Sequence, residues 1–156
     1  MAKIWIKNSH SQTLISVTLI RRIAKETLEA LGLQKAELSI LLLDDCSIAE
    51  LNQRYLHRCG PTDVISFPMH AKDIPQIQPS LLGDIVISVE TALRSAQQRA
   101  KPLEEVVAHL LIHGILHLIG YDHEASPREA LRMRRREHAL LKKIKPHYMP
   151  SPKALP

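Results

Sequence analysis

Residues 106–119 form the most apolar part of the chain, and this stretch contains three histidines, His109, His113 and His117. It is shorter than the ~20 uncharged apolar residues that a membrane span needs, and the histidines interrupt it. We therefore expect a helix over residues 103–119, opened by Pro102, at the centre of a globular fold rather than in a bilayer.

Strands and further helices are predicted on both sides of this helix from short apolar runs and from apolar residues at helical spacing. The predicted strands are 3–7, 38–43, 64–67 and 84–88; the other predicted helices are 14–31, one capped by Ser47 with Glu50, 89–100, and one opened by Ser126 and Pro127. Because these elements mix without strict alternation, the sequence predicts an α+β fold, with a small mixed β-sheet of about four strands packed with about five helices.

Length and composition indicate one ordinary domain. The chain has 156 residues and 45% hydrophobic residues, enough for a core of normal size. We expect a single hydrolase domain over residues 1–145, and a disordered tail over residues 146–156, which contain four prolines. The N-terminus lacks the apolar core of a signal peptide, so we expect a cytoplasmic protein without a membrane partner.

Charge is distributed unevenly along the chain. Residues 125–156 contain nine Lys or Arg and two Glu, a net charge of +7, whereas the whole chain carries +5. A basic C-terminal third suggests a polyanionic partner, although a solvated helix face explains the same pattern. An aromatic content of only 3% disfavours broad platforms for base stacking.

The spacing of His113, His117 and His123 predicts a metal site at the end of the central helix. Four residues turn a helix by roughly 400°, so His113 and His117 project in nearly the same direction. Gly120 can adopt a left-handed conformation and end the helix, and the returning chain then brings His123 to the other two. Three histidines leave the fourth tetrahedral position open, which is typical of catalytic zinc; other divalent ions such as nickel suit the same ligands.

Neighbouring residues refine this prediction. His109 stacks on the same side of the helix, but the turn at Gly120 brings His123 closer to His113 and His117, so we expect His109 to hydrogen-bond near the site rather than bind the metal. The spacing matches that of the metzincin proteases, but these place a Glu directly after the first His, where this chain has Gly114. This difference weakens the case for peptide hydrolysis.

Two carboxylates are candidates for contacts with the metal ligands. Asp122 precedes His123 directly and could orient a ligand. Glu137 lies on the apolar stripe of the last helix, where a carboxylate needs a partner. That partner is either a histidine of the metal site or an arginine, and the sequence slightly favours the arginine.

With these motifs in place, the chain resembles the YbeY-type bacterial endoribonucleases, which are ribosomal RNA maturation factors. The resemblance runs from about residue 38 to 141 and includes Leu51-Asn52 with Tyr55, the run 61–68, the run 83–88, the histidine block 109–123, Met133 and Glu137. It implies a zinc-dependent endoribonuclease specific for single strands, which acts in 3′-end maturation of 16S (small-subunit) rRNA and in ribosome quality control. It also implies His113, His117 and His123 as ligands of one Zn²⁺, and single-stranded rRNA and the small ribosomal subunit as partners.

The chain departs from this family at one position. The family usually has an Arg directly after the Tyr of the Leu-Asn-x-x-Tyr segment, and this chain has Leu56 there. Arg54 and Arg58 flank that position, and either is a candidate to replace the missing arginine. The further candidates for RNA binding are three arginines of the basic last helix, Arg128, Arg132 and Arg135.

Two other functions remain open from the sequence. One is a metal hydrolase that acts on a peptide or on another ester substrate. It needs a general base elsewhere in the chain, because Gly114 has no side chain to serve as one. The other is a non-catalytic RNA- or ribosome-binding module with a structural metal. The general base, the native metal and the oligomeric state also stay open at this point.

Overall fold

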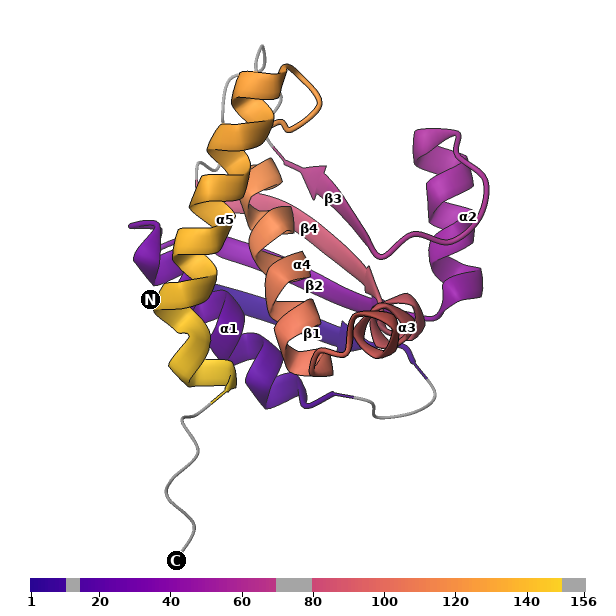
Figure 1. The fold of residues 1–156 in the computed structure, drawn as a ribbon, viewed down its shortest axis with the longest axis horizontal. Coiled ribbons are helices and arrows are strands. Elements are labelled where there is room, and N and C mark those ends of the chain that lie inside the picture. The colour runs from indigo at the N-terminus through magenta and orange to yellow at the C-terminus, as the bar shows by residue number, and fades with distance from the viewer. Residues whose placement is uncertain (11–14, 70–79, 150–156) are drawn as a thin grey trace, which may run out of the picture.

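Four strands form one mixed β-sheet in the computed structural model, which describes residues 1–10, 15–69 and 80–149 (Figure 1). The strands are β1 (Lys3–Asn8), β2 (Glu37–Leu43), β3 (Val64–Pro68) and β4 (Leu81–Ser88). Their order is β1-β2-β4-β3; β1, β2 and β4 are parallel, and β3 pairs antiparallel with β4. Five helices accompany them in the described residues, so the predicted α+β fold is confirmed.

One face of the sheet carries the main core. The helices α1 (Val17–Ala30), α3 (Val89–Arg99), α4 (Leu103–Leu118) and α5 (Pro127–Tyr148) contribute to it, and Figure 1 shows α4 and α5 side by side in front of the strands. Helix α4 is the central one, since its apolar side chains are almost all buried. Gly114 lets α4 approach the sheet closely, because a Cβ at this position would lie 3.0 Å from Cδ1 of Ile85.

The opposite face of the sheet is covered only in part. Helix α2 (Asp45–Leu56) packs Ile48 against Ile65 and Val86, over the β3 and β4 side. On the β1 side, the indole of Trp5 is 63% exposed. This face is therefore half covered by one helix and half open.

Several predicted boundaries are wrong: β4 begins at Leu81 rather than at residue 84, α1 begins at Val17 rather than at residue 14, and two helices differ at their caps or ends. Helix α2 is capped by Asp44, whose side chain accepts from the backbone N–H of Ser47, so the helix begins before the Ser47–Glu50 pair. Helix α5 continues through Pro146 to Tyr148 instead of ending at residue 145. Burial of the Tyr148 ring in the core favours this last turn despite the proline. The rest of the predicted tail, residues 150–156, lies outside the described residues.

None of the helices in the described residues is long and apolar enough to cross a membrane.

The N-termini of α2 and α3 are joined through one carboxylate. Asp45 of α2 accepts hydrogen bonds from the hydroxyls of Ser88 and Thr91, both at 2.6 Å, and pairs with Arg94 at 2.7 Å. In return, Glu90 of α3 accepts from the backbone N–H of Asp45 at 2.9 Å. Burial alone raises the pKa of Asp45, but the hydrogen bonds from Arg94, Ser88 and Thr91 outweigh it and lower the pKa to about 2.

Removing this carboxylate is expected to destabilise the protein in a pH-dependent way. Asp45→Ala lowers the free energy of unfolding by roughly 1 kcal/mol at neutral pH, because charged hydrogen bonds are lost. Since the folded-state pKa of about 2 lies below the usual 3.8, the stabilisation is present above pH 3.8 and disappears as the pH falls towards 2. Urea unfolding of both proteins across this range measures the difference. Glu50→Ala, at an exposed carboxylate of the same helix, is the control; an equal loss there would contradict the assignment.

Candidate metal centre and active site

The C-terminal turn of α4 and the loop that follows it bring three histidines together. His113 and His117 lie one turn apart on α4, as predicted. The helix then ends in a Schellman motif: the N–H of Gly120 donates to the carbonyl of His117, and the N–H of Tyr121 donates to that of Leu116. Gly120 has a φ of +107°, which favours glycine. This turn reverses the chain and places His123 opposite the two helical histidines.

The three imidazoles converge on one point. His117 Nε2 lies 3.1 Å from His113 Nε2 and 3.1 Å from His123 Nδ1, and one nitrogen of each ring lies within 4.8 Å of the other two. With metal–nitrogen bonds of about 2.0–2.1 Å, the edges of a tetrahedral site measure about 3.3–3.4 Å. The donor set therefore fits one tetrahedral metal ion with one vertex left over.

The protonation state of His117 also suits a ligand. Burial lowers the pKa of His117, and the nearby His113 and His123 lower it further, against a smaller opposing effect of Asp122. A neutral imidazole is the form that binds a metal.

Glu137 of α5 ties two histidines of α4 together. Its Oε2 lies 2.9 Å from Nε2 of His109, and its Oε1 lies 2.5 Å from Nδ1 of His113. The prediction that an arginine pairs with Glu137 is therefore wrong. The carboxylate is only 9% exposed, and both of its partners are histidines of α4. When His113 donates its Nδ1 proton to Glu137, its Nε2 lone pair is left facing His117 and His123.

The pair of histidines keeps Glu137 ionised. Burial raises the pKa of Glu137, but the hydrogen bonds from His109 and His113 outweigh it, so the pKa falls to about 2. His109 thus lies beside the site as predicted. Asp122 plays a different part, because its Oδ1 accepts from the backbone N–H of Glu124 at 2.9 Å and stabilises the loop.

The histidines open into a cavity of about 410 Å³ between α4, β3 and the end of α2. The α2 end contributes Leu56 and Arg58, and the opposite rim contributes Glu124. Arg58 and Glu124 approach to 3.8 Å, but both are 65% exposed, so this pair contributes little stability and leaves the guanidinium accessible. Of the two arginines that flank Leu56, Arg58 lines the cavity, whereas Arg54 is exposed on α2 and does not line it.

The β3 side of the cavity contains residues for which the sequence predicted no individual role. Thr62, Asp63 and Ser66 line it, and the Ser66 hydroxyl donates to the carbonyl of Gly114 at 3.3 Å, which fixes β3 against α4. The sequence signal that could have indicated these residues is the predicted turn at Pro61, which is followed closely by a short strand.

The predicted arginines of α5 lie in a separate groove of about 450 Å³. Its charged side chains are Arg128, Arg132, Arg135 and Arg136, and Tyr121 also lines it. The guanidinium of Arg132 stacks over the Tyr121 ring, with Cζ 4.6 Å from the centroid. Because Tyr121 precedes His123 by two residues, this arginine groove begins beside the histidine cluster.

Three histidines that leave one position open are typical of catalytic metal sites, and the arginines beside them fit a polyanionic substrate such as a nucleic acid. These features indicate a metal-assisted hydrolase that acts on a polyanion. The comparisons with known proteins agree with this class. The family model of endoribonuclease YbeY matches residues 5–145, and the chain belongs to this family. Its members are endoribonucleases, enzymes that cleave RNA at internal bonds.

Individual relatives cover most of the chain. It is 40% identical to the endoribonuclease YbeY of Syntrophotalea carbinolica over 96% of this chain and 100% of that protein. It is 44% identical to the one of Aquifex aeolicus over 80% and 81%, respectively. The solution structure of TM1509 from Thermotoga maritima matches with a TM-score of 0.66 and 25% identity, over 97% of this chain and 94% of that one.

The carboxylate of Glu137 is expected to tune metal affinity. Glu137→Gln removes the charge that orients His113, and we expect Zn²⁺ binding to weaken about 10- to 100-fold. Competition titration against a chromophoric chelator measures this, and circular dichroism verifies that the variant is folded. Glu129→Gln, at a more exposed glutamate of the same helix, is the matched control. Unchanged affinity in Glu137→Gln would show that the hydrogen bond to His113 does not support the site.

Proposed function

We propose that this endoribonuclease depends on Zn²⁺ held by His113, His117 and His123, and that it cleaves single-stranded RNA. The observation that carries the proposal is the convergence of three imidazole nitrogens beside a cavity that also contains Arg58. We further propose that its substrate is the 3′ end of 16S rRNA on the small ribosomal subunit. In this role it acts in ribosome maturation and quality control, in the cytoplasm. Membership of the endoribonuclease family supports this finer assignment.

The chemistry of the site divides between the metal and the chain. A bound Zn²⁺ would supply Lewis-acid stabilisation of the charge that develops on the phosphate. Glu137 holds His113 in the tautomer that leaves Nε2 free. Arg58, on the α2 side of the cavity, can donate N–H groups to phosphate oxygens of the strand being cut.

The shape of the site favours a flexible substrate. The histidines lie in a recess between α4, β3 and α2 rather than on a flat surface. A strand whose backbone can bend is able to bring a phosphodiester into such a recess, whereas the backbone of an A-form duplex is held in a regular helix. This supports the preference for single strands.

The structure also argues against peptide hydrolysis by the metzincin mechanism. The residue after His113 is Gly114, and a side chain there would meet Ile85 of the sheet. A general base at this position would therefore face the core.

Loss of one ligand is expected to abolish both metal uptake and cleavage. His117→Ala should bind no stoichiometric zinc by elemental analysis and should not cut single-stranded RNA in a gel assay. His138→Ala, an exposed histidine on α5, should behave as wild type. Full cleavage by the metal-free protein would contradict the proposal, and zinc-loaded protein that binds RNA without cutting it would indicate a non-catalytic binding module.

The arginine groove of α5 is expected to bind phosphates without reading sequence. Replacing Arg132 and Arg135 together with Ala should raise KM for RNA more than it lowers kcat. It should also reduce the slope of log affinity against log salt by roughly 1.4, for two lost contacts to a single strand. The control is Arg99→Ala at the end of α3, close in sequence to the start of α4 and far from its histidine end. An unchanged salt slope in the double variant would exclude the groove from RNA binding.

A further inference from the structure

A second cavity, of about 610 Å³, lies on the half-open face of the sheet. Its rims are β1, with Trp5 and Lys7, and α2, with Tyr55. Its floor includes Asp84 of β4 and Phe67 of β3. We call this the aromatic groove, and neither the metal centre nor the arginine groove shares a residue with it.

Three of the five aromatic residues of the chain meet here. Trp5 is 63% exposed and Tyr55 is 55% exposed, which is unusual for side chains that gain so much from burial. The Tyr55 and Phe67 rings contact each other edge to face at 5.4 Å. Exposed aromatic rings on an open four-stranded sheet are the surface on which unpaired bases stack in single-strand RNA-binding domains.

The charges around the groove fit a strand whose backbone follows one edge and whose bases point inward. Lys3, Trp5 and Lys7 alternate along β1 and share the open face, which gives the edge two cations. Lys3 is paired at 3.7 Å with Glu37 but is mostly exposed, and Lys7 lines the groove.

Asp84 is the acidic group of the floor. In the sheet register it lies between Ser39 of β2 and Phe67 of β3. A carboxylate repels phosphates but accepts hydrogen bonds from the exocyclic amino groups of adenine, cytosine and guanine, which uracil lacks. It therefore favours these bases over uracil, and it requires the phosphates to stay on the lysine edge.

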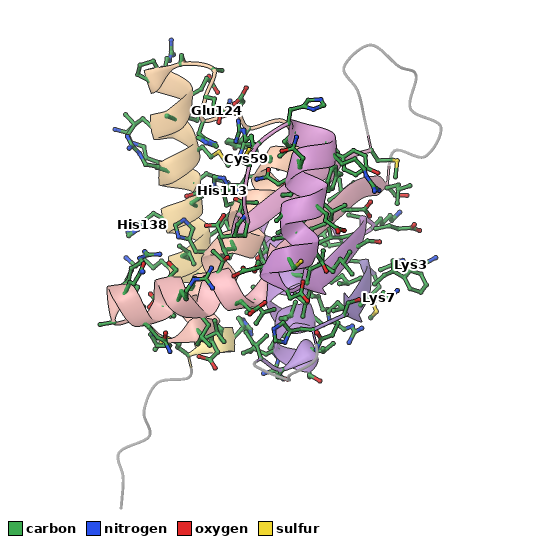
Figure 2. All side chains as sticks on the ribbon, turned by 90° about the vertical axis from the view of Figure 1, so that its right-hand side faces the viewer. Lys3, Lys7, Cys59, His113, Glu124 and His138 are labelled. Carbon is green, nitrogen blue, oxygen red and sulfur yellow. The ribbon has the colours of Figure 1, made fainter. Side chains whose placement is uncertain are left out.

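The aromatic groove and the metal cavity are separated by a single wall. On α2, Tyr55 lines the groove and the next residue, Leu56, lines the cavity; on β3, Phe67 lines the groove and Pro68 lines the cavity. Figure 2 shows α2 standing between the two regions, with His113 and Glu124 on one side and Lys3 and Lys7 on the other. A chain that leaves the cavity over this wall enters the groove.

We propose that the aromatic groove binds a single-stranded segment of the RNA substrate next to the bond that is cut, with bases stacked on Trp5 and Tyr55 and with a preference at Asp84 for a base that carries an amino group over uracil. The inference rests on the proposed function for the identity of the ligand. Continuity with the metal cavity and the lysine edge favour RNA over a protein partner.

The only tryptophan of the chain lies in this groove, so its fluorescence reports on it directly. Metal-loaded protein is titrated with fluorescein-labelled 2′-O-methyl oligocytidine or oligouridine, and the fluorescence anisotropy is recorded. Parallel titrations with the unlabelled oligonucleotides record the tryptophan emission. We expect Trp5 emission to be quenched over the same concentration range in which anisotropy rises, and oligocytidine to bind more tightly than oligouridine. Unchanged emission at saturating RNA would overturn the proposal.

Variants of Trp5 separate stacking from general apolar contact. Trp5→Leu should weaken binding about 5-fold or more, whereas Trp5→Phe, which keeps a ring, should stay closer to wild type. Asp84→Asn should reduce the preference for cytosine over uracil. Equal binding of RNA by Trp5→Leu and wild type would overturn the proposal. A change of Trp5 emission on addition of an apolar peptide but not of RNA would also overturn it.

Cleavage assays distinguish failure of this inference from failure of the proposed function. A short RNA that fills only the metal cavity should be cut equally by wild type and Trp5→Leu, and a longer RNA should be cut with a higher KM by the variant. If both lengths are cut equally by both proteins, the aromatic groove has no role and the endoribonuclease site stands. If neither RNA is cut but Trp5 is quenched, the groove stands and the proposed metal-dependent cleavage fails.

Discussion

The buried carboxylate of Glu137 is the interaction on which the site depends. It joins α5 to α4 through His109 and His113, and it is almost inaccessible to water. A buried negative charge is costly unless it is paired, and the two imidazoles supply that pairing. The same contact fixes the orientation of His113, one of the three candidate metal ligands. One group therefore contributes both to the α4–α5 interface and to the geometry of the candidate metal centre.

Helix α4 meets two opposing demands along its length. Most of its surface is buried against the sheet and the neighbouring helices, and Gly114 allows the approach to β4. One stripe must nevertheless present His109, His113 and His117. The stripe avoids the cost of buried polar groups because Glu137 satisfies its inner part and a cavity open to solvent lies at its outer part. The Schellman turn at Gly120 then places the third ligand without another element of secondary structure.

Helix α2 organises the surface around the site. Its N-terminus is held to α3 by Asp45, and its apolar side packs on β3 and β4. Because it covers only half of that face, it creates two cavities, one on each side of its C-terminal end. The candidate metal centre, the arginine groove and the aromatic groove are thus three neighbouring surfaces, of which only the first contains the three converging histidines.

The sequence by itself determined the order of the elements and the convergence of the three histidines, because both depend on local spacing. Apolar periodicity predicts the helices and strands, and His113, His117, Gly120 and His123 lie within about three helical turns of one another along the chain. Only the tertiary structure decided that Glu137 binds two histidines and that Arg58 rather than Arg54 lines the cavity. It alone gathered Trp5, Tyr55 and Phe67, which are far apart in the sequence, on one face of the sheet. These contacts depend on strand order and on which face each helix covers, and short-range patterns do not encode either.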